Sequence, residues 1–364
     1  MSSTDISSTD VSSADLPSAA APGALTSTMR EAGVLVSGAV TNVSVISDRS
    51  MLVSRIIRLG LTYGGAAPDA PKTLILKLPL PAFAKTMWHD GRHEVTFYRE
   101  LARMMPTRLV PGCYGGAFDE DETTWHLLLE DLTDTHQTAT QWPLPPSVPH
   151  AEAIVRALAR LHAAWWDDPR LGVTIGSLAT PEDTTKHSGL FAGHYQRFAD
   201  LLGDRLSAER RAVYDRFIAA SPRLLQRYHA RRNLSIAHGD AHVWNFLVPL
   251  AAGDNDVRAF DFDRWRINVP AHDLAYMIAL HQYPERRAVI ERPLLDCYHR
   301  TLVAHGVAGY DRAALDADYR FAVLWHITKP VWQWTVNIPP VIWWNHLERI
   351  FLAVDDLGCR ELLD

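Results

Sequence analysis

The chain has few cysteines for its length. Among 364 residues there are three, Cys113, Cys297 and Cys359, and no two of them stand at the spacing of a metal-binding pair. An odd number of scattered cysteines excludes a disulfide framework and a cysteine-based zinc site as the basis of the fold. We therefore expect reduced thiols and a cytoplasmic location.

The sequence also lacks a long apolar run and an excess of positive charge. No run approaches the roughly 20 apolar residues that a membrane-spanning helix needs, and the N-terminus has neither the basic start nor the apolar segment of a secretory signal. The formal net charge is −6, from 42 acidic and 36 basic residues, and three of the acids lie in the first 15 residues. The rest of the chain is nearly neutral, so we expect neither nucleic acid nor a membrane among its partners.

The first 28 residues contain no lysine or arginine. They repeat Ser-Ser-Thr-Asp and continue through serine, alanine and proline. A segment of this composition cannot bury enough apolar surface to offset the entropy lost on ordering. The prediction for residues 1–28 is therefore a disordered tail.

Two parts of different pattern follow the tail. Residues 29–133 contain mostly short β-rich runs and one helix, in which Glu94 and Tyr98 recur at the helical period. A segment rich in threonine, glutamine and proline leads into residues 134–364, where most apolar residues repeat at the helical period. We predict an α+β fold with a small β-rich N-terminal lobe and a larger, mostly helical C-terminal lobe.

One stretch of the second part carries most of the chemistry. It reads His-Gly-Asp-Ala-His-Val-Trp-Asn from His238 to Asn245, and Asp-Phe-Asp follows at 261–263. The residues between the two motifs indicate a strand, a turn and a second strand. Such a hairpin returns the chain to its start, so we expect the carboxylates of Asp240 and Asp261 to converge.

These residue types suit phosphoryl transfer, which needs positioned phosphates, magnesium and a group that orients the nucleophile. Magnesium prefers oxygen ligands, so the amide of Asn245 and the carboxylate of Asp261 are its candidate ligands. Asp240 is then the candidate catalytic base. It can act without a special pKa, because the hydroxyl proton becomes acidic only as the new bond forms.

The order of these motifs resembles the protein-kinase-like superfamily, and within it the aminoglycoside phosphotransferase and choline kinase group. His-Gly-Asp and Asp-Phe-Asp, in place of His-Arg-Asp and Asp-Phe-Gly, are typical of its small-molecule branch. The stretches Phe97–Leu101, Glu130–Leu132 and Leu158–Ala163 are similar to the ecdysteroid-kinase-like subgroup. The resemblance covers roughly residues 34–364 and implies a bilobal kinase-like fold, ATP as the phosphoryl donor and Mg²⁺.

The resemblance also assigns residues of the N-terminal lobe as the nucleotide site. Lys77 stands in an apolar strand, where a lysine is unfavourable unless it is paired. The matching lysine of the family binds the nucleotide's phosphates and a glutamate of the next helix, for which Glu94 is a better candidate than Glu100. Ser47–Ser50, which we predict to be a turn between two β-rich runs, takes the place of the phosphate-covering loop, although it contains no glycine. Glu130–Leu132 would offer backbone groups to adenine.

Two interpretations are open for the histidines of the motif. His238, Asp240 and His242 could form the zinc site of a metal-dependent hydrolase, but no further ligand stands at a defined spacing. We expect His238 to hold the catalytic loop by hydrogen bonds and His242 to line the site or to pack. Asp263 either assists the metal or forms an ion pair with a neighbouring arginine.

Two residues outside the motif are expected to have structural roles. The stretch Asp273–Tyr276 resembles the helix start that follows the metal-binding aspartate in this family. Asp273 is well placed to cap that helix. His162 shares a helical period with Leu158 and Leu161. We therefore expect His162 to be a buried structural histidine rather than a catalytic one.

Tryptophan is concentrated near the C-terminus, where five of the twelve fall between residues 325 and 344. They either pack between helices or form an acceptor pocket, for which Trp332, Trp334 and Trp343 are candidates beside Asp263 and His242. Aromatic walls suit an organic cation or an apolar alcohol. The few acidic residues nearby disfavour an aminoglycoside.

The resemblance thus implies an ATP-dependent phosphotransferase that acts on a hydroxyl of a small molecule. The alternative is a catalytically silent nucleotide- or ligand-binding protein of the same fold. The missing glycine at Ser47–Ser50 is the only sequence feature that favours this alternative.

Overall fold

The computed structural model describes residues 16–364 apart from 52, 86, 107, 252, 254 and 255. The chain forms two compact units. Unit 1 comprises the residues up to Gln137 together with Pro249–Arg264, and unit 2 comprises Thr138–Val248 and Trp265–Asp364.

The segment Pro249–Arg264 belongs with unit 1, although the sequence assigned it to the second lobe. Its contacts within unit 1 explain this. The backbone amide of Ala259 donates to the carbonyl of Leu109 at 2.8 Å, and the ring of Phe262 stacks on that of Phe97 with centroids 3.8 Å apart. The second aspartate motif therefore lies in the unit that contains the N-terminal sheet.

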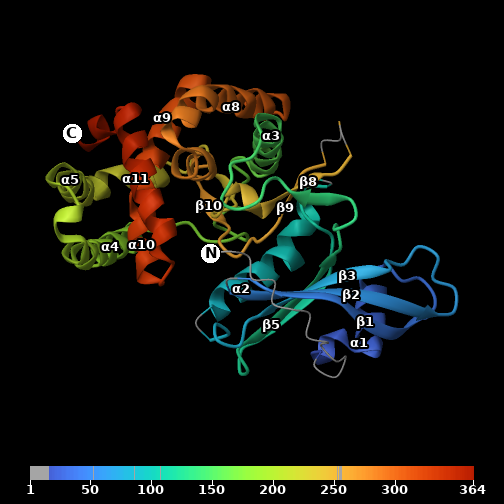
Figure 1. The fold of residues 1–364 in the computed structure, drawn as a ribbon. Helices are drawn as coiled ribbons and strands as arrows, with labels where there is room; N and C mark the ends of the chain where they lie inside the picture. The colour runs from blue at the N-terminus through green and yellow to red at the C-terminus, as the bar shows by residue number, and fades with distance from the viewer. Residues whose placement is uncertain (1–15, 52, 86, 107, 252, 254–255) are drawn as a thin grey trace. The chain divides into compact units, whose positions relative to one another are not determined.

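Unit 1 is built on a five-stranded antiparallel sheet with the order β1-β2-β3-β5-β4 (Figure 1). The strands are β1 (Ala39–Ser50), β2 (Ser54–Gly64), β3 (Thr73–Pro79), β4 (Cys113–Asp119) and β5 (Thr124–Glu130), and a short β9 (Arg258–Ala259) follows later in the chain. Helix α2 (Trp88–Thr96) continues as a π-helical turn (Phe97–Leu101) and packs on β4 and β5. Alternate residues of β2, Ile57, Leu59 and Leu61, are buried, as a strand with one face on the core requires.

The prediction of a turn at Ser47–Ser50 is wrong. These residues form the end of β1, where Ser47 pairs with Arg58 and Ser50 with Arg55. The guanidinium of Arg55 also donates to the carboxylate of Asp48 at 2.5 Å. Pairing with the long strand β2 and this cross-strand ion pair outweigh the turn-like composition of the segment.

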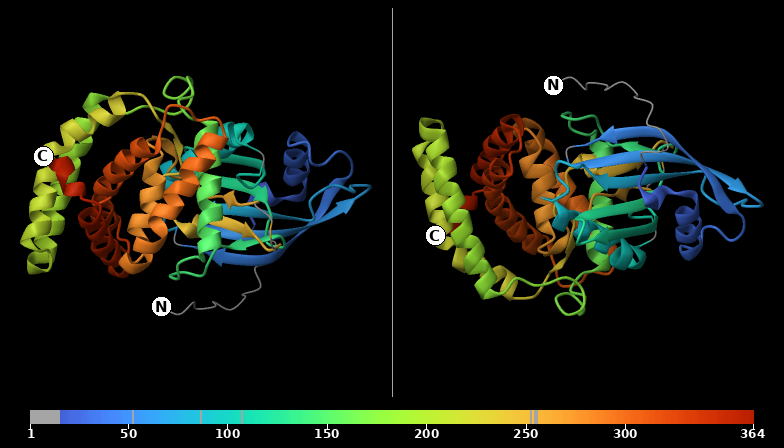
Figure 2. Two further views of the ribbon diagram at one scale, coloured as in Figure 1. Left: turned by 90° about the horizontal axis from the view of Figure 1, so that it is seen from above. Right: turned by 90° about the horizontal axis from the view of Figure 1, so that it is seen from below.

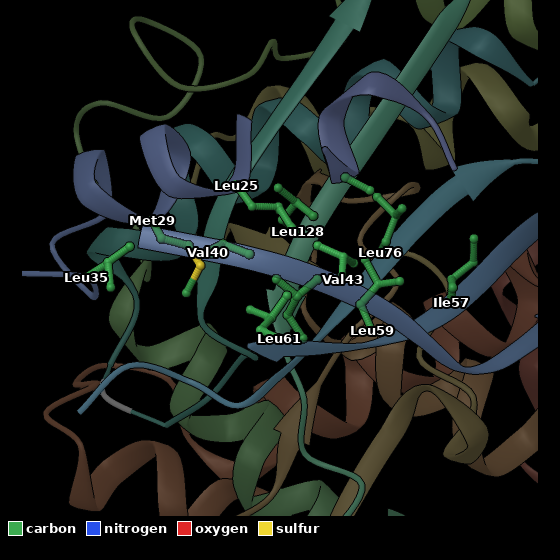
Figure 3. Packing of buried hydrophobic residues seen from close by; sticks show 12 residues of the cluster. Leu25, Met29, Leu35, Val40, Val43, Ile57, Leu59, Leu61, Leu76 and Leu128 are labelled. Carbon is green, nitrogen blue, oxygen red and sulfur yellow. The ribbon is translucent and has the colours of Figure 1, made fainter. Parts of the chain in front are cut away.

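The prediction of disorder is wrong for the part of the tail that the structure describes. Residues Pro22–Glu31 form helix α1, which packs on β1. Leu25 and Met29, one helical turn apart, lie against Val40 and Leu128 in the core of unit 1 (Figure 3). The average composition of the tail conceals this apolar stripe. Residues 1–15, which carry the serine repeats, lie outside the described residues.

Unit 2 is mostly helical, as predicted, and its longer helices are drawn from a second side in Figure 2. The helices are α3 (Val148–Ala164), α4 (Pro181–Leu202), α5 (Ala208–Leu224), α6 (Gln226–His229), α7 (Ala271–Ala275), α8 (Pro284–Ala304), α9 (Arg312–Trp325), α10 (Thr328–Thr335) and α11 (Pro340–Asp356). Helix α3 packs on α8, α4 lies beside α5, and α10 contacts both α4 and α11. Helices α9 and α10 were not predicted from the sequence.

The strands of the C-terminal half are short. They are β7 (Ser235–Ala237), β8 (Phe246–Pro249) and β10 (Arg266–Asn268), while β6 (His136–Thr138) lies at the first boundary of the units. β7 pairs with β10 in antiparallel register, with Ile236 opposite Ile267. This pair fixes the strand from which the His-Gly-Asp loop emerges. Among the described residues, no helix has both the length and the apolar character that crossing a lipid bilayer requires.

Candidate active site

A pocket in unit 1 contains several of the residues that the sequence singled out. Its lining consists of Val53, Ser54, Lys77, Pro79, Met87, Asp90, Gly91, Glu94, Trp125, Asp261 and Asp263. Four carboxylates and one ammonium group therefore meet in one hollow. Strand β3, helix α2 and the returning segment before Arg264 each contribute charged side chains to it.

Lys77 joins two of these carboxylates. Its Nζ lies 2.7 and 2.8 Å from the two carboxylate oxygens of Glu94 and 2.5 Å from Oδ1 of Asp261. The side chains of Lys77 and Glu94 are 9% and 1% exposed, whereas that of Asp261 is 37% exposed. The lysine is thus held from the buried side by Glu94, and Asp261 faces the opening of the pocket.

The pKa values of Lys77 and Glu94 are both raised, that of Lys77 by neighbouring negative charges and that of Glu94 by burial. Burial by itself lowers the pKa of Lys77, but the negative charges of Asp261, Glu94 and Asp263 outweigh burial and raise this pKa above its ordinary value. Burial raises the pKa of Glu94 to about 7, against the attraction of Lys77. The ammonium therefore stays charged at neutral pH, and the site holds more negative charge than one lysine balances.

Of the two glutamates considered for Lys77, Glu94 makes the contact and Glu100 is exposed at the end of the helix. Glu94 lies in the second turn of α2, which begins at Trp88, so its side chain points to β3 across the sheet face on which α2 packs. Glu94 was preferred because it lies at the helix start before Phe97 and Tyr98. The structure places its carboxylate at Lys77.

The backbone of Asp261 adopts a left-handed conformation with φ = +67°. This conformation is uncommon for a residue other than glycine and needs support from its surroundings. The next residue provides it, because the buried ring of Phe262 stacks on Phe97 and meets Tyr98 edge-on at 6.4 Å. The aromatic contacts anchor the loop and direct the Asp261 carboxylate at Lys77.

The position of Asp263 bears on both roles that the sequence left open. It lines the pocket and contributes to the raised pKa of Lys77, and its carboxylate also lies 3.9 Å from Nε of Arg264. Arg264 makes a closer ion pair with Asp90 of α2, at 2.8 Å. The stronger partner of Arg264 is therefore Asp90, which leaves Asp263 beside the lysine.

Sequence reasoning missed Asp90, Trp125 and Gly91. The indole ring of Trp125 lies beside the Lys77 ammonium, with 5.9 Å between Nζ and the ring centroid. A Cβ atom at position 91 would stand 2.0 Å from Nε1 of Trp125, so only glycine leaves room for this ring. A glycine within a helix was the available signal, since it is unfavourable there without a packing reason.

In unit 2 the motif from His238 to Asn245 forms a loop closed by its own hydrogen bonds. Gly239 has φ = +81°, a conformation open to glycine. The carbonyl oxygen of Asp240 accepts from the amide of His242 at 2.7 Å and from Nδ2 of Asn245 at 3.0 Å. Asn245 is buried, and its side-chain carbonyl is the oxygen left for other ligands.

Asp273 anchors this loop. Its carboxylate accepts from the amides of His238 at 2.7 Å and Gly239 at 2.9 Å, and from Nε2 of His162 at 3.0 Å. Although burial opposes it, hydrogen bonding and the charge of His162 lower the pKa of Asp273. The prediction that Asp273 caps its helix is wrong, because no side chain caps α7, whose preceding residue is Pro270. His162 is fully buried, and Nδ1 of His238 accepts from the amide of Asp240 at 3.4 Å.

Asp240 lies in positively charged surroundings. Its carboxylate is 3.4 Å from Nζ of Lys329 and 3.5 Å from Nε2 of His242. Burial would raise the pKa of Asp240, but the charge of Lys329, followed by His242 and a hydrogen bond from Tyr276, lowers it below its ordinary value. Asp240 is therefore ionised at neutral pH. Lys329 was not found from the sequence, since 89 residues separate it from Asp240.

The three candidate tryptophans divide into two groups. Trp332 lies next to Lys329, whose ammonium stands 4.6 Å from its ring centroid and 3.4 Å from Oδ1 of Asp240. Trp334 and Trp343 instead pack around Phe198 of α4, at centroid distances of 5.7 and 5.4 Å. Trp334 and Trp343 therefore pack between helices, and an acceptor contact stays a prediction for Trp332.

The remaining nucleotide-site candidates lie in unit 1. Ser47 and Ser50 are on β1, as described above. The amide of Glu130 donates to the carbonyl of Gly112 at 2.7 Å, and the carbonyl of Leu132 accepts from the amides of Thr135 and His136. These two backbone groups are engaged within the protein, so an adenine contact at Glu130 or Leu132 would use other groups.

The zinc alternative finds no support in the geometry. Within the part of the chain that the structure describes, no three histidine, cysteine, aspartate or glutamate side chains form a group that could hold a metal. The predicted approach of Asp261 to Asp240 joins residues of different units and stays a prediction.

Comparisons with known proteins give a family and a fold. No curated protein matches the sequence. A structure named as a candidate aminoglycoside phosphotransferase from Ralstonia eutropha JMP134 matches at 13% identity over 93% of this chain and 97% of that chain, with a TM-score of 0.55. The microcompartment-associated aminopropanol kinase matches at 13% identity over 92% and 96%, with a TM-score of 0.56. At such identities the likeness shows a common fold alone.

The family assignment rests on the sequence. The model of the ecdysteroid kinase-like family matches residues 51–307, which include Lys77, the loop from His238 to Asn245 and Asp261. The resemblance expected from the motifs is thereby confirmed, as is the kinase-like fold. The chain belongs to the ecdysteroid kinase-like family.

Proposed function

We propose that the chain is an ATP-dependent phosphotransferase that moves the γ-phosphoryl group to a hydroxyl of a small molecule. The observation that carries this proposal is the buried contact of Lys77 with Glu94 and Asp261. Membership in the ecdysteroid kinase-like family supports the same chemistry. The fold shared with an aminopropanol kinase agrees with it.

In this proposal Lys77 binds the phosphates of the nucleotide. Its ammonium is charged at neutral pH and is fixed by Glu94, so little side-chain freedom remains to be lost when an anion binds. Trp125 and Gly91 shape the pocket beside it. Glu94 is thus a positioning residue that acts through Lys77.

Magnesium is the metal that we propose for this chemistry, because it prefers oxygen ligands. Four carboxylates and one ammonium line the unit 1 pocket, and burial, with the charge of Asp261 as a smaller cause, raises the pKa of Glu94. We propose Asp261 as an oxygen ligand, with Asp263 assisting. Asn245 stays a candidate ligand from the sequence motif alone. A bound magnesium ion would neutralise charge on the transferring phosphates.

Asp240 would orient the acceptor hydroxyl and receive its proton. Its lowered pKa keeps it ionised, so it can accept a hydrogen bond from a hydroxyl before the reaction. Asp273 holds the loop amides on either side of Gly239, and Asn245 holds the Asp240 carbonyl. The carboxylate is therefore presented from a backbone with little freedom to move.

The competing proposal is a silent binding protein of the same fold. Its support is the absence of glycine from Ser47–Ser50. The retained base and metal residues favour the active enzyme. An acceptor screen that reads ADP release, run on wild type and Asp240→Asn, tests this: we expect turnover only in the wild type, with ATP binding kept in both. Wild-type-like turnover of Asp240→Asn would remove Asp240 from the mechanism.

The location remains a proposal from composition. Cys113, Cys297 and Cys359 are free thiols. Free thiols are usual in reducing compartments, which supports the cytoplasm as the place where the protein works. Cysteine labelling of the protein in intact cells would test this.

A further inference from the structure

The ammonium of Lys329 occupies a site of the kind that binds organic cations. It lies 4.6 Å from the ring centroid of Tyr276, 4.6 Å from that of Trp332 and 3.4 Å from Oδ1 of Asp240. Two aromatic faces and a carboxylate are the groups that recognise an ammonium ligand. Lys329 is 15% exposed and Asp240 25% exposed, so this arrangement is close to the surface that an acceptor would reach.

The position of Lys329 in its helix is unfavourable without this arrangement. It stands in the first turn of α10, which begins at Thr328 and has no acidic residue in that turn. A positive charge at a helix N-terminus opposes the helix dipole. The contacts with Asp240, Tyr276 and Trp332 offset this repulsion. These tertiary contacts, rather than the helix itself, therefore stabilise the ammonium at this position.

The surroundings disfavour a second positive charge. Burial lowers the pKa of His281 to about 3 and that of His326 to about 4, and it lowers the pKa of His346 well below its ordinary value. The charge of Lys329 adds to this effect at His326 and His346. These histidines stay neutral mainly because they are buried, and at His326 and His346 the charge of Lys329 contributes.

We infer that Lys329 is a specificity-determining residue, which fills a cation subsite beside Asp240 with the chain's own ammonium and so excludes acceptors whose ammonium group lies next to the reacting hydroxyl. This inference rests on the proposed function, in which Asp240 faces the acceptor hydroxyl. The part of the acceptor next to the reacting hydroxyl would then be uncharged. Lys329 and Trp332 lie outside residues 51–307, so the family match does not include them.

The test compares two ligands of nearly the same shape by ligand-observed NMR titration. Choline carries a quaternary ammonium, and neohexanol is its uncharged carbon analogue. We expect the wild type to bind neohexanol at least as well as choline. Lys329→Ala should bind choline at least about tenfold more tightly than the wild type does, while its affinity for neohexanol changes by less than about threefold.

Two further variants serve as controls. Lys329→Arg keeps the positive charge and should resemble the wild type. Lys329→Ala combined with Trp332→Leu removes one wall and should lose the gain in choline affinity. Thermal unfolding checks that each variant is folded.

Two outcomes would overturn the inference. One is tighter binding of choline than of neohexanol by the wild type, a result that requires no variant. The other is a folded Lys329→Ala protein without increased choline affinity. Because the titration uses neither nucleotide nor turnover, failure of the proposed phosphotransferase activity would be seen separately, in the assays with ATP.

Discussion

The ammonium group of Lys77 lies 2.5 Å from Oδ1 of Asp261, a residue 184 positions later in the chain. Both residues belong to unit 1, because Pro249–Arg264 returns to the N-terminal sheet. The contact ties the Asp-Phe-Asp loop to strand β3, and Glu94 holds the same ammonium from helix α2. A buried, negatively charged pocket with one fixed cation results.

Removal of that cation should destabilise the protein. Lys77→Met leaves the carboxylate of Glu94 buried without its ammonium partner, so we expect a loss of about 3 kcal/mol in the free energy of unfolding at pH 8. The loss should shrink toward lower pH, where Glu94 can take up a proton. Urea unfolding measures both. Lys72→Met, which changes an exposed lysine of the same unit, should alter stability by less than about 0.5 kcal/mol.

The pH dependence of stability should report Glu94. Its pKa is raised to about 7 in the folded protein, above the value of about 4.3 expected in the unfolded chain. The folded form therefore binds the proton more tightly, and this contribution to stability is present below about pH 4 and is lost as the pH rises through 7. Glu94→Gln removes this loss, so its stability relative to wild type should rise across that range by up to about 3 kcal/mol.

The matched control for this titration is Glu100→Gln, which changes an exposed glutamate at the end of the same helical segment. Its stability should follow the wild-type profile at a constant offset. If Glu94→Gln ran parallel to the wild type as well, the raised pKa of Glu94 would be contradicted.

Asp273 should be essential for the shape of the catalytic loop. Asp273→Asn replaces one of the two carboxylate oxygens by an NH2 donor, which would face the N–H group of either His238 or Gly239. We expect a loss of about 2–4 kcal/mol in unfolding free energy and a strong fall in turnover. Asp311→Asn is the control, since Asp311 caps α9 by accepting from the amide of Ala314 and asparagine caps equally well. Equal stability of the two variants would contradict the anchoring role.

Gly91 should be intolerant of a methyl group. A Cβ atom there would stand 2.0 Å from Nε1 of Trp125, so Gly91→Ala forces the indole to move and should cost about 1–3 kcal/mol of stability. Gly189 of α4 has nothing within 4 Å of its Cβ direction, and Gly189→Ala should stabilise by up to about 1 kcal/mol. Thermal unfolding distinguishes the two. If Gly91→Ala left the stability unchanged, Trp125 would have room to move, and the predicted clash would be contradicted.

The sequence was sufficient where local signals and motif order agree. The β-rich N-terminal region and the helical C-terminal region followed from the pattern of apolar residues. Glu94 was preferred over Glu100 because it precedes an aromatic pair. Asp263 was placed near Asp261 by adjacency alone. These cases depend on residues that are close in sequence or on a fixed order of motifs.

The sequence was insufficient where distant residues decide the structure. Ser47–Ser50 looks like a turn, but pairing with β2 makes it a strand. Asp273 looks like a helix cap, but amides 34 and 35 residues earlier take its carboxylate. Lys329 carries no motif and becomes informative only through its distance to Asp240. In each case a tertiary contact outweighs a local preference.

The most direct test of the account is a calorimetric titration of ATP with and without Mg²⁺ into the wild type, Lys77→Met and Asp240→Asn. The account predicts saturable, magnesium-dependent binding to the wild type and to Asp240→Asn, and its loss in folded Lys77→Met. Absence of binding to the wild type at millimolar ATP, or undiminished binding to Lys77→Met, would contradict the assignment of the Lys77–Glu94–Asp261 group as a nucleotide site.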